Sequence, residues 1–159
     1  MARLLSAGFD TSVLVTGDSF FAFLDQGAIP PWLPGSAPQN DVVTEAAAAA
    51  TGRFARGDYT VVYDGLIGPW YLSTFLRATA LERLHYAILL PDEPTCVQRV
   101  RTRLGHGFAD LPATRNMHAQ FTAADIEPRH VLGPPSEDPA ATVATIRQRL
   151  AAGELAVPR

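Results

Sequence analysis

Short apolar runs alternate along the chain with longer stretches of helical character. The runs occupy residues 12–16, 59–63 and 84–90, with a weaker one at 129–132. The first three carry apolar side chains at consecutive positions, which is typical of parallel strands covered on both faces. A half-exposed antiparallel strand would alternate apolar and polar positions instead. The pattern therefore predicts strands in these runs, most of them buried and parallel.

Between and beyond these runs the sequence favours helices. Gly57 follows an alanine-rich stretch, and Asp138 and Gly153 stand where a cap and a stop of the last helix belong. The alternation of strand and helix predicts an α/β fold with a mainly parallel sheet. We expect a single domain over residues 1–159. The expected helices span residues 41–56, 94–103, 113–122 and 139–152.

Two segments depart from this alternation. Residues 1–7 (MARLLSA) have the pattern of the end of an amphipathic helix with no strand ahead of it, so we expect the sequence to begin partway into a βα unit. Residues 29–39 (IPPWLPGSAPQ) hold too many prolines for a regular element, and they predict an ordered loop over the sheet edge.

The composition excludes several kinds of chemistry. All 13 basic residues of the 159 are arginine, so this chain can form neither a Schiff base nor a phosphate-binding lysine of the Walker A type. Cys96 is the single cysteine, which excludes an internal disulfide and a zinc site built on cysteine pairs.

The charge and hydropathy of the sequence limit the kinds of partner that we expect for this protein. A net charge of −3 without a basic block gives no electrostatic footprint for nucleic acid. There is no apolar run of about 18 residues, as a membrane span would need, and no signal-peptide pattern. We therefore expect a cytoplasmic protein with no nucleic-acid or membrane partner.

Acidic residues follow two of the expected strands directly. Asp18 comes after the first strand and Asp64 after the second, with Gly65 and Gly68 close behind. Because ligands of open α/β sheets bind at the carboxyl ends of strands, the pair suits a metal, a general base or a substrate hydroxyl. The alternative is that each aspartate only caps the helix that follows it.

An arginine series follows the third strand. Several guanidiniums beside the glycine-rich residues 105–107 could form a lid that clamps phosphate groups. The alternative is a solvated basic face, since arginine has to do all the ordinary surface work in a chain without lysine. The series comprises Arg99, Arg101 and Arg103, with Arg115 further on.

The order of these motifs resembles a known family. Seven motifs follow one another in an order that resembles the small P-loop kinases, a group that includes ATP-binding, AAA-type ATPases. The motifs are TGDSFF, IPPWLP, QND, VVYDGLIGPWYL, LHYAILLP, CVQRVRTR and GHGFAD. Similar proteins are chloramphenicol phosphotransferase, zeta toxins, and the shikimate and gluconate kinases. The resemblance extends from Met1 to about Leu132, and its most specific parts are TGDSFF and VVYDGLIGPW.

The resemblance implies a three-layer P-loop NTPase-like fold in which the first strand and the Walker A loop are absent from this chain. It also implies ATP and magnesium as cofactors, and transfer of a phosphoryl group to a small-molecule hydroxyl. Without the Walker A loop, we expect impaired activity or none in the chain as given. The carried-over roles are catalysis for Asp18, Arg99, Arg103 and Arg115, water-mediated magnesium binding for Asp18, and acceptor binding for Asp64, Gly65, Gly68 and Trp70.

Two other functions stay open at this point. Gly17-Asp18-Ser19 resembles the GDS block of SGNH esterases, with Ser19 as nucleophile. Residues 38–41 (PQND) faintly resemble the GxND block of these esterases, although Pro38 replaces its glycine. Residues 127–130 (EPRH) resemble their DxxH block, although Glu127 replaces its aspartate. The chain could also be a binding module or remnant without catalysis.

Overall fold

The computed structural model describes residues 1–102, 108–133 and 138–158, and the account below refers to these residues. They form two compact units. The first comprises Met1–His85 together with the C-terminal residues from Ala156 on, and the second comprises Tyr86–Leu155. Each unit is described by itself.

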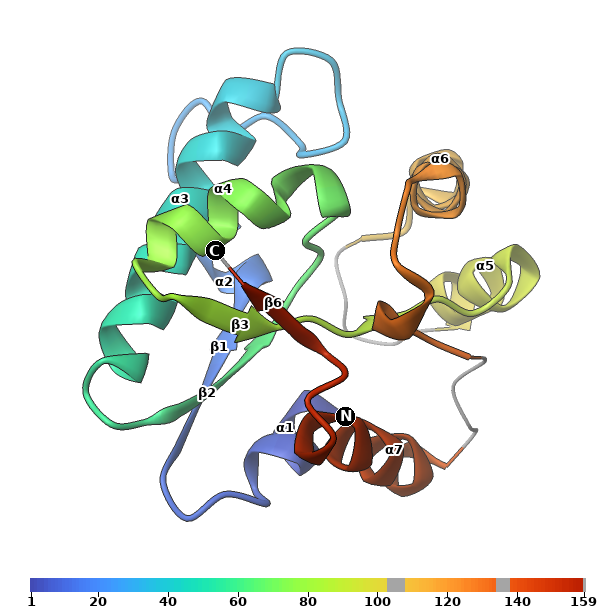
Figure 1. The fold of residues 1–159 in the computed structure, drawn as a ribbon. Coiled ribbons are helices and arrows are strands. Elements are labelled where there is room, and N and C mark those ends of the chain that lie inside the picture. The colour runs from blue at the N-terminus through green and yellow to red at the C-terminus, as the bar shows by residue number, and fades with distance from the viewer. Residues whose placement is uncertain (103–107, 134–137, 159) are drawn as a thin grey trace. The chain divides into compact units, whose positions relative to one another are not determined.

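A parallel pair of strands is the centre of the first unit (Figure 1). Strand β1 spans Ser12–Thr16, as the sequence predicts, and β2 spans Thr60–Asp64, one residue later than predicted. Helix α3, Ala37–Ala55, connects them and begins four residues earlier than the predicted helix. Helix α1, Ala2–Ser6, lies against both strands, which fits the helical pattern of residues 1–7.

Two helices of the first unit were not predicted from the sequence. Helix α2, Gly17–Phe21, begins directly at the end of β1, and α4, Pro69–Thr79, follows β2 after a short loop. Helix α4 packs along α3 (Figure 1). The two helices approach closely because Gly52 of α3 has no side chain: a β-carbon there would overlap the backbone of Thr79.

The expected strand at residues 84–90 is interrupted, which corrects that prediction. Strand β3, Arg83–His85, pairs antiparallel with a C-terminal strand β6, Ala156–Pro158, whereas β4, Ile88–Leu89, belongs to the second unit. Tyr86 lies at the break. Its N–H donates to the carbonyl of Leu155, and its carbonyl lies 2.9 Å from Nδ1 of His130, so side-chain and loop contacts replace a continuous ladder there.

The second unit contains a second parallel pair, β4 with β5, Val131–Leu132. The predicted strand at 129–132 is therefore shorter, because the 3₁₀ helix η1, Pro128–His130, takes its first part. All three predicted helices of this region are present. They are α5, Glu93–Thr102, α6, Leu111–Ala123, and α7, Pro139–Ala151, where Asp138 accepts a hydrogen bond from Ala140 as the predicted N-cap.

The fold is thus mixed helix and strand, consistent with the α/β class, with small parallel sheets. Among the described residues the strands form three separate two-stranded sheets, of which β1–β2 and β4–β5 are parallel and β3–β6 is antiparallel. Buried side chains of the first unit, such as Val15, Ala48 and Phe75, come from β1, α3 and α4.

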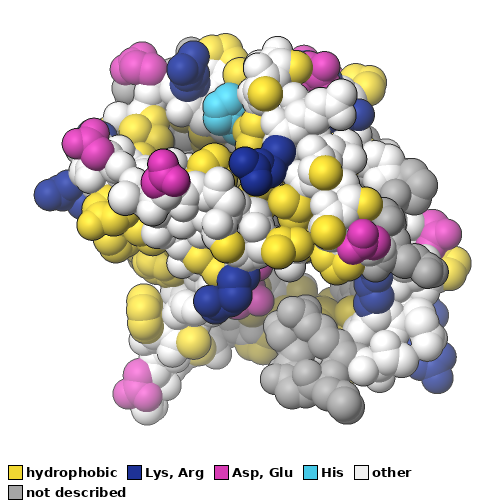
Figure 2. Space-filling view, turned by 90° about the horizontal axis from the view of Figure 1, so that it is seen from below, with side chains coloured by type: hydrophobic (Ala, Val, Ile, Leu, Met, Phe, Trp, Pro, Cys, Tyr) yellow, Lys and Arg dark blue, Asp and Glu magenta, His cyan; other side chains and the backbone are white. Residues whose placement is uncertain are grey.

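The surface carries charges of both signs. On the face drawn in Figure 2, arginine side chains are interspersed with aspartate, glutamate and apolar side chains. No helix within the described residues is long and apolar enough to span a membrane.

Candidate functional site

The two predicted acidic residues lie at the same edge of the β1–β2 pair. The parallel register places Thr16 of β1 opposite Asp64 of β2, so both strands end together. Asp18 follows two residues after Thr16, in the first turn of α2, and Asp64 is the last residue of β2. Both residues are exposed. The carboxyl ends of the strands therefore present two carboxylates to solvent.

The charges of both carboxylates act on Tyr63, which sequence reasoning did not single out. Its hydroxyl lies against Gly17, where a β-carbon would overlap it. Its ring lies over Gly65, where a β-carbon would come within 2.7 Å of Cε1. The ring of Phe75 from α4 meets that of Tyr63 edge to face, with 4.8 Å between the centroids. The glycines at the two strand ends thus make room for one aromatic ring.

The environment of Tyr63 keeps its hydroxyl protonated. Burial, and then the negative charges of Asp18 and Asp64, raise the pKa of Tyr63 to about 12. A phenol is a hydrogen-bond donor as long as it is protonated. The site therefore combines two carboxylate acceptors with one neutral donor. The signal in the sequence was a tyrosine at the end of a strand, flanked by glycines in both strand-end turns.

The loop after β2 places the predicted acceptor-binding residues beside this edge. Gly68 is the N-cap residue of α4, and Pro69 opens the helix as proline commonly does. The indole of Trp70 folds back onto Gly68, since a β-carbon on Gly68 would overlap it. Gly65, Gly68 and Trp70 thus belong to one short connection that starts at Asp64.

The predicted lid arginines belong to the second unit. Arg99 lies exposed near the end of α5. Arg115 lies on α6, and its Nε is 3.3 Å from a carboxylate oxygen of Glu93, with both side chains about half exposed. Arg103 and residues 105–107 lie outside the described residues. Arg115 therefore has an acidic partner within its own unit.

The blocks of the esterase interpretation already have other contacts. Asn40 donates to the carbonyl of Pro31 at 2.8 Å. Glu127 pairs with Arg129, whose Nε lies 2.6 Å from Oε2. His130 is buried, and its Nδ1 lies 2.9 Å from the carbonyl oxygen of Tyr86. Asn40 thus holds a loop, Glu127 is part of a surface ion pair, and His130 is packed in the core. These contacts give no support to a catalytic triad with Ser19.

The site fits magnesium better than it fits a nucleotide. Mg²⁺ prefers oxygen ligands and is commonly held by one or two carboxylates, with water and substrate phosphates as further ligands. Asp18 and Asp64 could supply such carboxylates, although no group of three or more metal-binding side chains occurs in the described part of the chain. The phosphates of ATP do not fit these residues, since the chain has no lysine and Asp18 places a negative charge in the first turn of α2.

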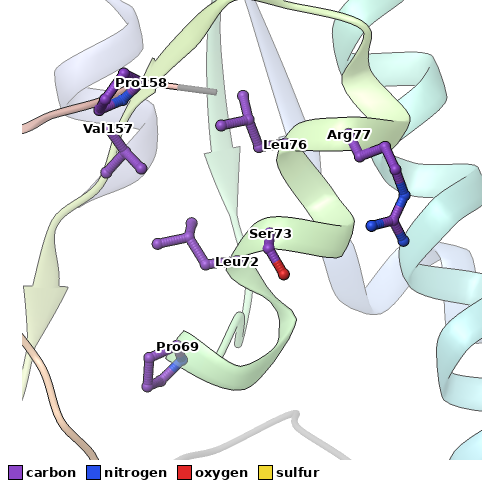
Figure 3. A pocket seen from close by; sticks show the side chains of 7 residues that line it. All are labelled: Pro69, Leu72, Ser73, Leu76, Arg77, Val157 and Pro158. Carbon is purple, nitrogen blue, oxygen red and sulfur yellow. The ribbon is translucent and has the colours of Figure 1, made fainter.

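A separate pocket of about 430 Å³ lies beneath α4 (Figure 3). Figure 3 shows Leu72 and Leu76 of α4 and Val157 of β6 directed toward a common space, whereas Arg77 is directed away from it. Pro69, Ser73 and Pro158 complete the lining with these four residues. None of the sequence-predicted site residues lines this pocket, so it is distinct from the strand-end site.

The chain was compared with models of known protein families and with curated protein sequences. Neither comparison gave a match. The functional argument therefore depends on the residues of the chain and on their geometry.

Proposed function

We propose that this chain is the acceptor-binding part of an ATP-dependent phosphotransferase that acts on a small-molecule hydroxyl. One observation carries the proposal: β1 and β2 end in register, and Asp18, Asp64 and the neutral hydroxyl of Tyr63 gather at that edge. Phosphoryl transfer needs positioning of the hydroxyl and neutralisation of charge more than covalent chemistry by the protein.

Each of these groups has a role in the proposed reaction. Asp18 is exposed in the first turn of α2, where its carboxylate can accept the proton of an acceptor hydroxyl. The phenol of Tyr63 supplies a donor that orients either the acceptor oxygen or a carboxylate beside it. Asp64 holds the acceptor together with the loop through Gly65, Gly68 and Trp70. ATP supplies the phosphoryl group when bound.

The finer fold assignment is part of the same proposal. Strand β2 is paired with β1 alone among the described residues, and β6 belongs to another sheet. Helix α4 covers β2 through Phe75, while Leu72 and Leu76 of the same helix line the pocket whose other wall is Val157 of β6. A further strand between β2 and β6 would fill this space and give the three-layer P-loop NTPase-like fold.

The residues that hold the nucleotide must then come from outside these 159. A phosphate-binding loop needs a lysine together with backbone amides at a helix N-terminus, and the chain contains no lysine. We therefore expect the chain as given to bind ATP weakly or not at all.

The proposal is tested by reading the gene upstream of Met1 in the same frame. We expect a strand followed by GxxGxGK[ST] within about 10 to 20 codons, the length of one strand and the loop. The extended protein should bind MgATP in a calorimetric titration and transfer labelled phosphate to a hydroxyl compound. A stop codon in that interval, or no MgATP binding by the extended protein, would refute the proposal.

Two matched substitutions in the extended protein test the role of Asp18. Asp18→Asn should lower the transfer rate about 100-fold or more, in the range expected for loss of general base catalysis. Asp10→Asn makes the same chemical change at an exposed residue ahead of the opposite end of β1, and it should leave the rate unchanged. Equal rates for the two variants would contradict the assignment of Asp18.

A further inference from the structure

A second cavity, of about 320 Å³, lies where α3 turns into β2. Helix α3 ends at Ala55 and β2 begins at Thr60, so this cavity lies at the opposite end of β2 from Asp64. It is part of the first unit, and it shares no described residue with the strand-end site or with the pocket beneath α4. Its described lining residues are Arg53, Phe54, Gly57 and Tyr59.

Backbone hydrogen bonds hold the turn that forms this cavity. The carbonyl of Phe54 accepts from the N–H of Gly57 at 2.9 Å and from that of Tyr59 at 3.3 Å. The N–H of Thr60 donates to the carbonyl of Thr11, directly ahead of β1, at 3.1 Å. The turn is thus fixed to the end of α3 and to the sheet, so the cavity is built into the fold.

Two aromatic rings form walls of the cavity. The rings of Phe54 and Tyr59 meet edge to face, with 6.2 Å between their centroids and 86° between their planes. Phe54 is 43% exposed and Tyr59 is 47% exposed, so nearly half of each residue is uncovered. Aromatic rings attract a further ring through offset stacking and edge-to-face contact. The two walls therefore suit an aromatic group.

A guanidinium group lies beside the same turn. A β-carbon on Gly57 would lie 3.3 Å from Nη1 of Arg53, so the guanidinium is folded against the glycine. Arg53 is in the last turn of α3 and is exposed, which leaves its charge accessible to a ligand. A guanidinium is always charged in proteins, and its planar array of donors matches a carboxylate. The cavity therefore places one positive charge beside two aromatic walls.

The other charged groups of the turn are placed differently. Asp58 follows Gly57 with a φ of 66°, and it is exposed and absent from the described lining. The guanidinium of Arg56 donates to the carbonyl of Thr79. Arg53 is therefore the charged residue of this turn that lines the cavity, and it favours an anionic group there. Because Arg53 reaches solvent and Asp58 is close to it in sequence, we expect the preference for an anion to be modest.

We propose that this cavity binds a small aromatic carboxylate, with its ring against Phe54 and Tyr59 and its carboxylate paired with Arg53. Ligand sites in proteins have volumes of about 300–1,000 Å³, so a cavity of about 320 Å³ suits a ligand with a single ring. An aromatic amine would bring its positive charge to the guanidinium, which is unfavourable. The site goes beyond the proposed function, since none of the described residues that line it is assigned to phosphoryl transfer.

Amide NMR shifts of the isotope-labelled chain test this proposal. The probes are phenoxyacetate, its neutral counterpart phenoxyethanol, and acetate as a carboxylate without a ring. We expect phenoxyacetate to shift the amide signals of Phe54, Gly57 and Tyr59 saturably, with a Kd in the low millimolar range for a ligand of this size. Phenoxyethanol should bind at the same residues about threefold more weakly, and acetate should give no saturable shift. Equal binding of phenoxyacetate and phenoxyethanol, or no saturable shift at these residues, would overturn the proposal.

Substitution of two arginines, each in the last turn of a helix, tests the ion pair. Arg53→Gln keeps a long polar side chain at an exposed position, so folding should persist. It should lower phenoxyacetate binding about threefold, to the level of phenoxyethanol, whereas Arg53→Lys keeps the charge and should retain most of the preference. Arg77→Gln makes the same change in the last turn of α4 and should bind as the unchanged chain does. If Arg77→Gln loses the preference and Arg53→Gln retains it, the ligand occupies the pocket beneath α4 and the proposal fails.

One further variant tests the aromatic walls. Tyr59→Ser removes one of the two rings at a half-exposed residue, so it should weaken binding of both phenoxyacetate and phenoxyethanol about three- to tenfold. Leu4→Ser, on α1, changes a residue that is also 47% exposed, and this matched control should bind both probes normally. Circular dichroism checks that both variants are folded. Undiminished binding of both probes by folded Tyr59→Ser would contradict the proposal.

Discussion

The hydroxyl of Tyr63 allows a quantitative test of the site geometry. Burial and the charges of Asp18 and Asp64 raise its pKa from 10.0 to about 12. Because the folded-state pKa is raised above the unfolded one, the protonated phenol stabilises the fold below pH 10. This contribution is lost as the pH rises toward the folded pKa.

The size of the effect follows from the shift. Each pKa unit corresponds to about 1.4 kcal/mol. At pH 11, about one unit above the pKa of the unfolded chain, linkage gives a loss of about 1.4 kcal/mol of the free energy of unfolding from Tyr63 alone. The full loss of about 3 kcal/mol is reached only above pH 12.

The assay is urea unfolding at pH 8 and pH 11 for the unchanged chain and for Tyr63→Phe. Other groups also titrate, among them Tyr86, whose pKa burial raises to about 12. The informative quantity is therefore the difference between the two proteins, which should shrink by about 1.4 kcal/mol between the two pH values. Asp64→Asn removes one of the two charges and should reduce the pH dependence. An equal loss in the unchanged chain and in Tyr63→Phe would refute the reasoning.

Three further changes test the packing and the helix ends. Gly52→Ala favours the helix by about 1 kcal/mol through its higher helix propensity, but the added methyl group overlaps the Thr79 backbone. Because such overpacking costs about 1–3 kcal/mol, calorimetry should show a lower Tm than for the unchanged chain. A higher Tm would contradict the close approach of α3 and α4. Asp138→Ala removes the N-cap of α7 and should cost about 1 kcal/mol in urea unfolding, whereas Asp138→Asn should cost less. Glu93→Gln breaks an ion pair between half-exposed groups and should change the free energy of unfolding by less than about 1 kcal/mol.

The parts of the fold that the sequence predicts are those with a strong local pattern. The consecutive apolar residues of β1 gave its bounds without error, and Asp138 was found as a cap from its residue type and place. Helices α2 and α4 were missed. Helix α2 is only five residues long, and α4 begins with Pro69 inside a glycine-rich stretch that resembles a loop.

Other features depend on contacts between distant residues. The break at Tyr86 requires the C-terminal strand β6 beside β3 and His130 beside the Tyr86 carbonyl, neither of which a local pattern can show. At the candidate site, Asp18 and Asp64 were found because strand ends can be read from the sequence. Tyr63 was missed because its importance arises only when Gly17 and Gly65, from two separate strand ends, both come to lie against its side chain.

Among the described residues β2 pairs with β1 alone, so its second edge has no strand partner there, and this has a consequence for the behaviour of the protein in solution. An exposed strand edge offers free N–H and C=O groups to any other extended chain, and it therefore promotes aggregation. With the apolar pocket beneath α4 close to that strand, copies of the isolated chain are expected to precipitate as their concentration rises. Sedimentation measured at increasing protein concentration would detect this association. A strand added along β2 should improve solubility, which can be checked before any catalysis is assayed.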